Sequence, residues 1–546
     1  MGDGVALLAA LAVFHPLLRA PRYDDDRMQL AWLRGLVPTR RPLWDLYAWV
    51  RPGDYAVAHP GGHFPWWAPP GVRTGVFRPL ASLTLWFDVH ALRGSALAAH
   101  VHSMLWLALL ALAAGRFFRA LLPREGSARV ALVALLTSAP LAFDLGWLCN
   151  RCAIMSCALG LLTLDRMARW CSGGARRDLA AGVALWLLAL GAGEYAFAVL
   201  PLAASLVFRA DAGDARRGRL GALTLGALSV GWFLMSVRLG YGGADMNAAI
   251  DPAADPVRFL TRAPGRVVVL VVAWLRSFVS SGVRWLDALA AVALLAVALS
   301  ALPALSNKPQ RRALALWVGA FLASCAVLSA ALLQVRVLLP AMISFAGALG
   351  ALWQVGRWRR ARQAAIVALI ALQASSSWQL SRALSAREQA RDRALIESGR
   401  RLAGVGSGRF LVVTASDAEV VINPARAWAA EGLLAPRAWV VVGAVDEPML
   451  VVRTAAQELR VRSFRQGPIL PRGVGAAPVR VGGVTLEPRA FRDGAATEVR
   501  VTFPADPTSL GWTLVEARGT RLEALRLPPV NAGRLTNGPP DRRSTP

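Results

Sequence analysis

Three consecutive aspartates, Asp24, Asp25 and Asp26, follow closely after the first apolar run of the chain, residues 5–18. Carboxylates lose solvation when they are buried, so such a cluster must be hydrated, paired with cations or bound to a metal. A positioned carboxylate can serve as a general base, and three together could hold Mg²⁺ or Mn²⁺. We therefore expect residues 21–27 to form the front of an active site, with a solvated loop as the alternative.

Further ionisable side chains fall at the ends of later apolar runs. Ionisable residues at a membrane edge are costly and are functional candidates by default. Carboxylates and arginines that converge on one face suit a phosphate-bearing substrate and a general base. Simpler roles are open: Glu194 could cap a helix, and Arg336 could be an anchor that reaches the interface. Arg151 could pair locally with Asp144. The candidates are Asp144, Arg151, Glu194 and Arg336.

The composition indicates a membrane protein. Only 17% of the 546 residues are charged and 55% are hydrophobic, whereas about 25% of residues are charged in typical soluble domains. The mean hydropathy is +0.44. The net charge of +27 comes almost entirely from arginine. These arginines fall between apolar runs, which favours contact with anionic lipid headgroups over nucleic acid.

The hydropathy pattern predicts an all-α polytopic membrane domain with about eleven transmembrane helices. One further run, residues 267–280, contains Arg276. If this run does not cross, all the short basic connections fall on the cytoplasmic side, so we expect a re-entrant or surface helix there. The expected spans are residues 5–18, 96–114, 130–147, 149–164, 179–192, 195–208, 220–237, 285–305, 313–333, 335–355 and 364–380.

The expected domains are a membrane domain over residues 1–383 and a small β-rich, α+β domain over residues 384–532. Within the first, residues 20–78 form an outer loop whose tryptophans are typical of short interfacial helices. The second contains short runs with alternating polarity and turn residues between them. An odd number of spans places this domain outside the cytoplasmic membrane. Residues 533–546 are expected to form a disordered tail.

The cysteines and histidines give weaker signals. Cys149 and Cys152 have the spacing of a redox or metal pair, but no second pair exists, so zinc is not expected. Redox chemistry and simple packing of small residues both remain open for this pair. His100 and His102 point to different faces of a helix, so they should not share a metal.

Several motifs together resemble the GT-C superfamily of membrane glycosyltransferases, in particular protein O-mannosyltransferase-like members that often carry tetratricopeptide repeats. Tyr23-Asp24-Asp25 resembles their F-x-x-D-D first outer loop. The stretch Phe77-Arg-Pro-Leu80, with the helix that follows it, resembles their YRPL region. The other matching stretches are Leu145-Gly-Trp-Leu-Cys-Asn-Arg151, Gly193-Glu194-Tyr195 and Val335-Arg336-Val-Leu-Leu-Pro340, in the same order over residues 1–380.

The resemblance implies an inverting hexosyltransferase that uses a polyprenyl-phosphate-linked sugar and an envelope protein or glycan as acceptor. It implies that Asp25, or else Asp24, is the general base. Arg336 and Arg151 would hold the lipid phosphate, with Arg78 as a further contact. Glu194 would orient the site or bind the acceptor, and Asp144 stands one position from a family glutamate. The protein would be a multi-pass protein of a bacterial inner membrane, without nucleic acid as partner and with no certain cofactor.

Departures from the family pattern favour an alternative. Ala153 replaces an aspartate, Gly193 a lysine and Val335 a glutamate of the family motifs. The C-terminal region does not resemble tetratricopeptide repeats. These differences fit a non-catalytic envelope protein that binds glycan or a partner through its C-terminal domain. A transporter would place charged or helix-breaking residues at mid-span in paired halves, whereas here the polar groups gather at one face.

Overall fold

The computed structural model describes residues 2–36, 39–59, 65–122, 124–208, 212–244, 250–279, 284–353, 359–405, 408–415, 420, 424, 428, 433, 436–445, 448–465, 467–471 and 474–536. The chain forms two compact units. The helical unit comprises Met1–Asp26, Arg41–Trp49 and Arg73–Arg387. The β-rich unit comprises Arg27–Arg40, Val50–Val72 and Glu388–Pro546. A separate β-rich C-terminal region is therefore confirmed.

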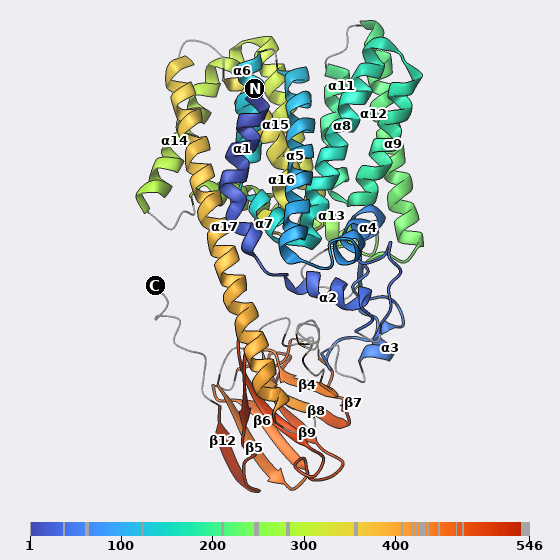
Figure 1. The fold of residues 1–546 in the computed structure, drawn as a ribbon, viewed down its shortest axis with the longest axis vertical. Helices are drawn as coiled ribbons and strands as arrows, with labels where there is room; N and C mark the ends of the chain where they lie inside the picture. Colours follow the sequence, from blue (N-terminus) through green and yellow to red (C-terminus); the bar gives the residue numbers. More distant parts are fainter. Residues whose placement is uncertain are drawn as a thin grey trace. The chain divides into compact units, whose positions relative to one another are not determined.

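The helical unit is built from helices packed side by side (Figure 1). Helix α8 is almost entirely buried, with α5 and α9 packed against it. Helix α3, most of α2 and the end of α17 belong to the β-rich unit. The helices of the described residues are α1 (Gly2–Phe14), α2 (Asp24–Leu33), α3 (Asp54–Ala58), α4 (Pro79–His90), α5 (Ala96–Leu121), α6 (Glu125–Leu136), α7 (Pro140–Gly146), α8 (Arg151–Gly173), α9 (Arg176–Ala192), α10 (Tyr195–Val199), α11 (Ala204–Phe208), α12 (Ala212–Arg238), α13 (Pro256–Val279), α14 (Arg284–Ser306), α15 (Lys308–Leu328), α16 (Leu339–Leu352) and α17 (Arg359–Ala403). Four 3₁₀ turns lie at η1 (His15–Arg19), η2 (Leu148–Asn150), η3 (Leu200–Ala203) and η4 (Val335–Leu338).

Within the described residues, six helices are long and apolar enough to cross a membrane, or up to seven if α6 and α7, bent by 55°, form one span. The prediction of eleven spans is wrong. Pro16 lies in η1 directly after α1, and Pro201 lies in η3 between α10 and α11. Proline lacks the amide hydrogen that continues an α-helix, so apolar runs counted as spans form short or broken helices. Residues 267–279 of the run that contains Arg276 lie in α13, which is not one of the six, and residue 280 lies outside the described part.

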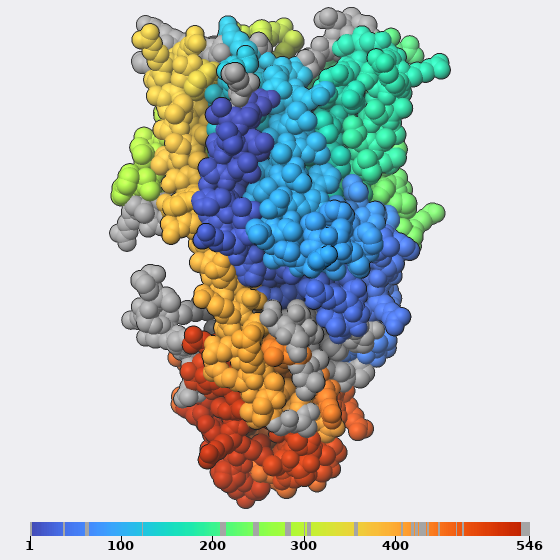
Figure 2. Space-filling model, viewed as in Figure 1, coloured from blue at the N-terminus to red at the C-terminus, as the bar shows by residue number. Residues whose placement is uncertain are grey.

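The candidate spans carry apolar side chains on their surface, as helices in contact with lipid do. On α5 the exposed side chains recur at helical spacing, at Leu97, Val101, Leu105 and Leu112. Figure 2 shows α5, in light blue, as part of the molecular surface. The described structure therefore supports a membrane protein.

The β-rich unit contains two sheets. One has the order β11-β10-β3-β4, with β3 parallel to both β10 and β4, and the other has the antiparallel order β12-β5-β6-β9-β8-β7. Alternation explains the layering: Leu459 and Val461 of β6 point to the core, and Arg460 and Arg462 point outward. The strands are β3 (Arg409–Thr414), β4 (Ala438–Gly443), β5 (Met449–Ala455), β6 (Glu458–Ser463), β7 (Val479–Val481), β8 (Val484–Arg492), β9 (Ala495–Thr502), β10 (Trp512–Arg518), β11 (Arg521–Leu525) and β12 (Ala532–Leu535). A short pair, β1 (Arg73–Gly75) and β2 (Gly242–Ala244), belongs to the helical unit.

Two domain boundaries and the placement of one tryptophan differ from the expectation. Helix α17 continues past residue 383 to Ala403. Strand β12 pairs with β5 across residues 532–535, so the expected tail begins as ordered sheet, while residues 537–546 lie outside the described part. Trp66, from the expected interfacial loop, is buried in the core of the β-rich unit, where its indole N–H donates to the Val442 carbonyl at 3.3 Å.

Candidate functional site

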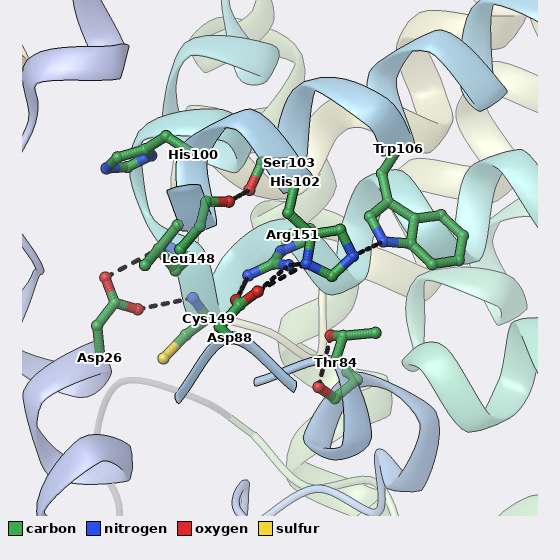
Figure 3. A network of polar contacts seen from close by, with 12 residues as sticks. Asp26, Thr84, Asp88, His100, His102, Ser103, Trp106, Leu148, Cys149 and Arg151 are labelled. Carbon is green, nitrogen blue, oxygen red and sulfur yellow. Dashed lines mark hydrogen bonds and ion pairs between the residues drawn. The ribbon is translucent and has the colours of Figure 1, made fainter. Parts of the chain in front are cut away.

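A tight turn at residues 147–151, between α7 and α8, is the point on which the site is built. The Asp26 carboxylate accepts the backbone N–H groups of Leu148 (3.3 Å) and Cys149 (2.7 Å) (Figure 3). The Tyr47 hydroxyl donates to the Cys149 carbonyl at 2.6 Å. Burial raises the pKa of Asp26, although the Cys149 contacts oppose this shift. Asp26 is therefore an anchor that holds the turn from the side of the aspartate loop.

The other two aspartates face different surroundings. Asp25 is partly exposed, whereas the Asp24 side chain lies outside the described part of the structure. The neighbouring Tyr23 ring stacks on Trp147 of the turn, with ring centroids 5.5 Å apart. The segment that leads into α2, and so to Asp25, thus lies against the turn.

Arg336, in η4, reaches the same turn from a distant part of the chain. Its guanidinium lies 4.4 Å from the centre of the Trp147 ring. It donates to Gln334 Oε1 at 2.7 Å and to Asn150 Oδ1 at 3.4 Å. Among the described side chains, its polar partners are thus amide oxygens and not carboxylates. A guanidinium in this state keeps its charge available for an anion.

Asn150 connects this arginine to two further groups. Its amide nitrogen donates to Asp144, and its oxygen also accepts the Tyr195 hydroxyl at 3.0 Å. Asp144 Oδ2 and Trp147 Nε1 are buried and have no hydrogen-bond partner among the described residues. Buried polar atoms of this kind usually have a partner, so the turn offers one acceptor and one donor that a bound molecule or water could satisfy.

Arg78 and Glu194 form a paired site beside the turn. Arg78 Nε donates to Glu194 Oε2 at 2.7 Å, and Nη2 donates to the other oxygen. The guanidinium also lies over the Tyr47 ring at 4.7 Å and the Tyr195 ring at 5.9 Å. Burial alone would raise the pKa of Glu194, but the Arg78 charge and hydrogen bonds hold it below its usual value. Arg78 is nearly buried and the Glu194 side chain is 36% exposed, so the carboxylate faces outward on an ionised pair.

The simpler expectation, a local pair between Arg151 and Asp144, is wrong. The Arg151 guanidinium bonds to both oxygens of Asp88, and His102 Nδ1 lies within hydrogen-bond distance of both Asp88 and Arg151 (Figure 3). Burial would raise the pKa of Asp88, but the His102 hydrogen bond and the Arg151 charge hold it below its usual value. An arginine paired in this way has no charge to spare for a lipid phosphate, so the structure favours a positioning role.

Sequence reasoning assigned no role in the site to several polar residues that the structure brings together: Tyr47, Asp88, His102, Asn150 and Tyr195. One signal was visible for Asp88, because it continues the spacing of Ala81 and Leu85, which form the buried face of α4. A carboxylate at a core position requires a partner.

The described side chains contain no group of three His, Cys, Asp or Glu residues arranged to hold a metal ion. Both oxygens of Asp26 accept backbone N–H groups, which leaves it poorly placed as a metal ligand. Asp26 therefore serves the turn, and a metal held by all three aspartates stays a prediction.

The fold and these networks define a membrane protein with a polar site at one end of its buried helix α8 and a separate β-rich C-terminal region. Comparison with protein-family models gives no match, and a search of the curated proteins gives no similar sequence.

Proposed function

We propose that the protein is a membrane glycosyltransferase that transfers a sugar from a polyprenyl-phosphate-linked donor to an envelope acceptor, either protein or glycan. One observation carries this proposal: Trp147 contacts both Tyr23 of the aspartate loop and Arg336. A candidate base and a candidate phosphate ligand, far apart in sequence, thus meet at one turn. The resemblance to GT-C enzymes supplies the reaction class.

Arg336 is the proposed ligand of the donor phosphate. Arginine presents two parallel N–H groups that match two phosphate oxygens. The apolar surfaces of the neighbouring spans suit an isoprenoid chain, which gains free energy by staying in hydrocarbon. Arg151 is reassigned from phosphate contact to positioning because Asp88 already neutralises it.

Asp25 is the proposed general base, with Asp24 as the alternative. It would take the proton of an acceptor hydroxyl while that oxygen bonds to the anomeric carbon and the bond from carbon to phosphate oxygen breaks. The attack on the opposite face inverts the anomeric centre. The phosphate leaves with an additional negative charge, which Arg336 would stabilise. Glu194 and Asp144 Oδ2 would accept hydrogen bonds from sugar or acceptor hydroxyl groups, with Arg78 holding Glu194 in place.

The test is purification in lipid nanodiscs followed by mass spectrometry of bound lipid. We expect a polyprenyl-phosphate sugar with the wild type, and its loss in Arg336→Ala but not in the control Arg258→Ala, an exposed arginine of α13. The double variant Asp24→Asn with Asp25→Asn should keep the lipid and lose transfer to envelope acceptors. Transfer that persists in this double variant would remove both aspartates from catalysis.

The second candidate is a non-catalytic envelope protein that binds glycan or a partner through the β-rich unit. Two aromatic side chains of that unit favour it, since Phe464 is 60% and Phe491 43% exposed. Exposed aromatic residues commonly mark binding surfaces. The enzyme proposal would give way to this one under two results together. The wild type would carry no lipid-linked sugar and show no transfer, and it would bind envelope material in a way that Phe464→Ser and Phe491→Ser abolish.

A further inference from the structure

Arg151 is a buried cation at the start of a candidate membrane span. It is the first residue of α8 and only 1% of it is exposed. An unpaired charge in this position would cost several kcal/mol. Asp88 of α4 compensates the charge, accepting Nη2 on one oxygen and Nη1 at 3.4 Å on the other. The pair therefore joins α4 to the beginning of α8.

The Asp88 carboxylate, which pairs with Arg151, is itself in contact with the His102 ring. His102 Nδ1 lies 2.7 Å from Asp88 Oδ1, and Trp106, one helical turn further along α5, donates its indole N–H to Nε2 at 3.1 Å. An indole nitrogen can only donate, so Nε2 must be the accepting nitrogen. Nδ1 also lies 2.6 Å from Nη1 of Arg151, so the ring contacts both members of the ion pair (Figure 3).

Three helices are thus joined at one residue of the 147–151 turn. The next residue toward the N-terminus is Asn150, whose carboxamide contacts Arg336, Tyr195 and Asp144. A single peptide bond separates the buried cluster from the group that contacts Arg336. Functional groups must be held to about 0.5 Å by surrounding hydrogen bonds, and the cluster supplies such support.

We propose that Asp88, His102 and Trp106 are positioning residues that set the 147–151 turn through Arg151 and so orient Asn150 and Arg336 for an anionic ligand. That the ligand is a lipid phosphate rests on the proposed function. The three residues themselves need not touch it. The contact at Nδ1 is the specific part of the inference: the cluster requires a polar atom at the position of Nδ1, between Asp88 and Arg151, and an acceptor for Trp106 at the position of Nε2.

Two substitutions at His102 separate positioning from bulk. In His102→Asn the side-chain amide can place an N–H near the position of Nδ1, whereas His102→Gln places its amide group near Nε2. The probe is undecaprenyl phosphate in nanodiscs, with affinity measured by native mass spectrometry. We expect about a tenfold loss in His102→Gln and less than about twofold in His102→Asn. Ser103→Ala is the matched control, since Ser103 bonds only to the Ala99 carbonyl among described residues, within its own helix.

A second readout needs no ligand. Cys149 is a buried cysteine outside any disulfide and lies within the turn, so its reaction with a membrane-permeant maleimide, mapped by mass spectrometry, reports displacement of the turn. We expect faster labelling in His102→Gln than in wild type, His102→Asn or Ser103→Ala. If His102→Gln fails to fold, Trp106→Phe is the alternative variant. It keeps an aromatic ring at position 106, removes the indole N–H that donates to His102 Nε2, and should also increase the labelling of Cys149.

The outcomes separate the two proposals. Equal labelling of Cys149 in His102→Gln and His102→Asn, or equal labelling in Trp106→Phe and wild type, would overturn the positioning inference. Absence of undecaprenyl phosphate binding in the wild type, together with the expected labelling pattern, would contradict the donor of the proposed function and leave the positioning inference supported.

Discussion

Two arginines at one turn differ in how their charge is compensated. Arg151 is buried and bonds to both oxygens of Asp88. Arg336 is partly exposed, and its partners among the described residues are two amide oxygens and the Trp147 ring. A buried cation without a carboxylate would be strongly destabilising, so the first arrangement is what folding requires. In the second the hydrogen bonds go to neutral groups, and Asp144 and Glu194 interact with the charge only electrostatically, which leaves the guanidinium able to bind an anion.

Arg78 lies between these extremes. It is paired with Glu194 as closely as Arg151 is with Asp88, but the Glu194 carboxylate remains accessible. The three arginines therefore form a series: Arg151 is buried in an ion pair, Arg78 is in an accessible ion pair, and Arg336 is hydrogen-bonded to neutral amide oxygens. Stability should depend on them in that order, and ligand binding in the reverse order.

The largest effect is expected at Asp88. Asp88→Asn keeps the volume but leaves the Arg151 charge buried without a counter-ion, which should lower the free energy of unfolding by about 3–5 kcal/mol. All five cysteines are buried, so thermal unfolding can be followed with a thiol-reactive dye. Asp88→Glu is the control that keeps the charge. A loss below about 1 kcal/mol in Asp88→Asn would show that Arg151 has another counter-ion.

A smaller loss is expected at Glu194. Glu194→Gln removes a charge-assisted pair, and because water reaches the carboxylate we expect about 1–2 kcal/mol. The pKa of Glu194 is lower in the folded protein than in the unfolded chain. The folded state therefore binds fewer protons, and the contribution is present above the unfolded pKa and lost as the pH falls through the folded one. The wild type should lose stability on acidification, and Glu194→Gln should lose less. Parallel acid profiles for the two proteins would contradict this assignment.

The contrast between arginines was only partly predictable from sequence. Arg78, Glu194 and Arg336 were recognisable because each is an ionisable residue between apolar runs. The pairing of Arg151 with Asp88 was not recognisable, since the two residues are 63 residues apart in sequence and meet only through the packing of α4 on α8. Hydropathy also could not show where proline interrupts a helix, so the number of spans was overestimated.

The aspartate loop teaches the same lesson at shorter range. Three adjacent carboxylates were treated as one cluster, but α2 begins at Asp24, and successive residues on a helix point about 100° apart. Asp26 therefore turns into the protein while Asp25 stays partly exposed. The β-rich region was more readily predicted, because alternation such as that of β6 is a local property. The placement of Trp66 was not, because its partner Val442 lies 376 residues away.

Tyr195→Phe tests whether Tyr195 links Arg78, which is paired with Glu194, to Arg336. The substitution keeps the ring beneath Arg78 and removes the hydroxyl that donates to Asn150 at 3.0 Å. One neutral hydrogen bond contributes about 0.5–1.5 kcal/mol, so the stability loss should be modest. Affinity for undecaprenyl phosphate should fall as Asn150 gains freedom. An affinity that stays unchanged in Tyr195→Phe would indicate that Asn150 is fixed by Asp144 alone.

At Arg336 we expect the smallest effect of a substitution on stability and the largest effect on binding. Arg336→Ala loses a partly solvated contact with Trp147 and two hydrogen bonds to amides, and should change the free energy of unfolding by less than about 1 kcal/mol. Arg336→Lys keeps the charge and should retain part of the phosphate affinity, because an ammonium group cannot donate two parallel hydrogen bonds. If Arg336→Ala instead destabilises the protein as much as Asp88→Asn, carboxylates such as Asp144 and Glu194, which interact with it electrostatically, must compensate its charge. The two arginines would then both be structural, and the charge at the turn would no longer be available to an anion.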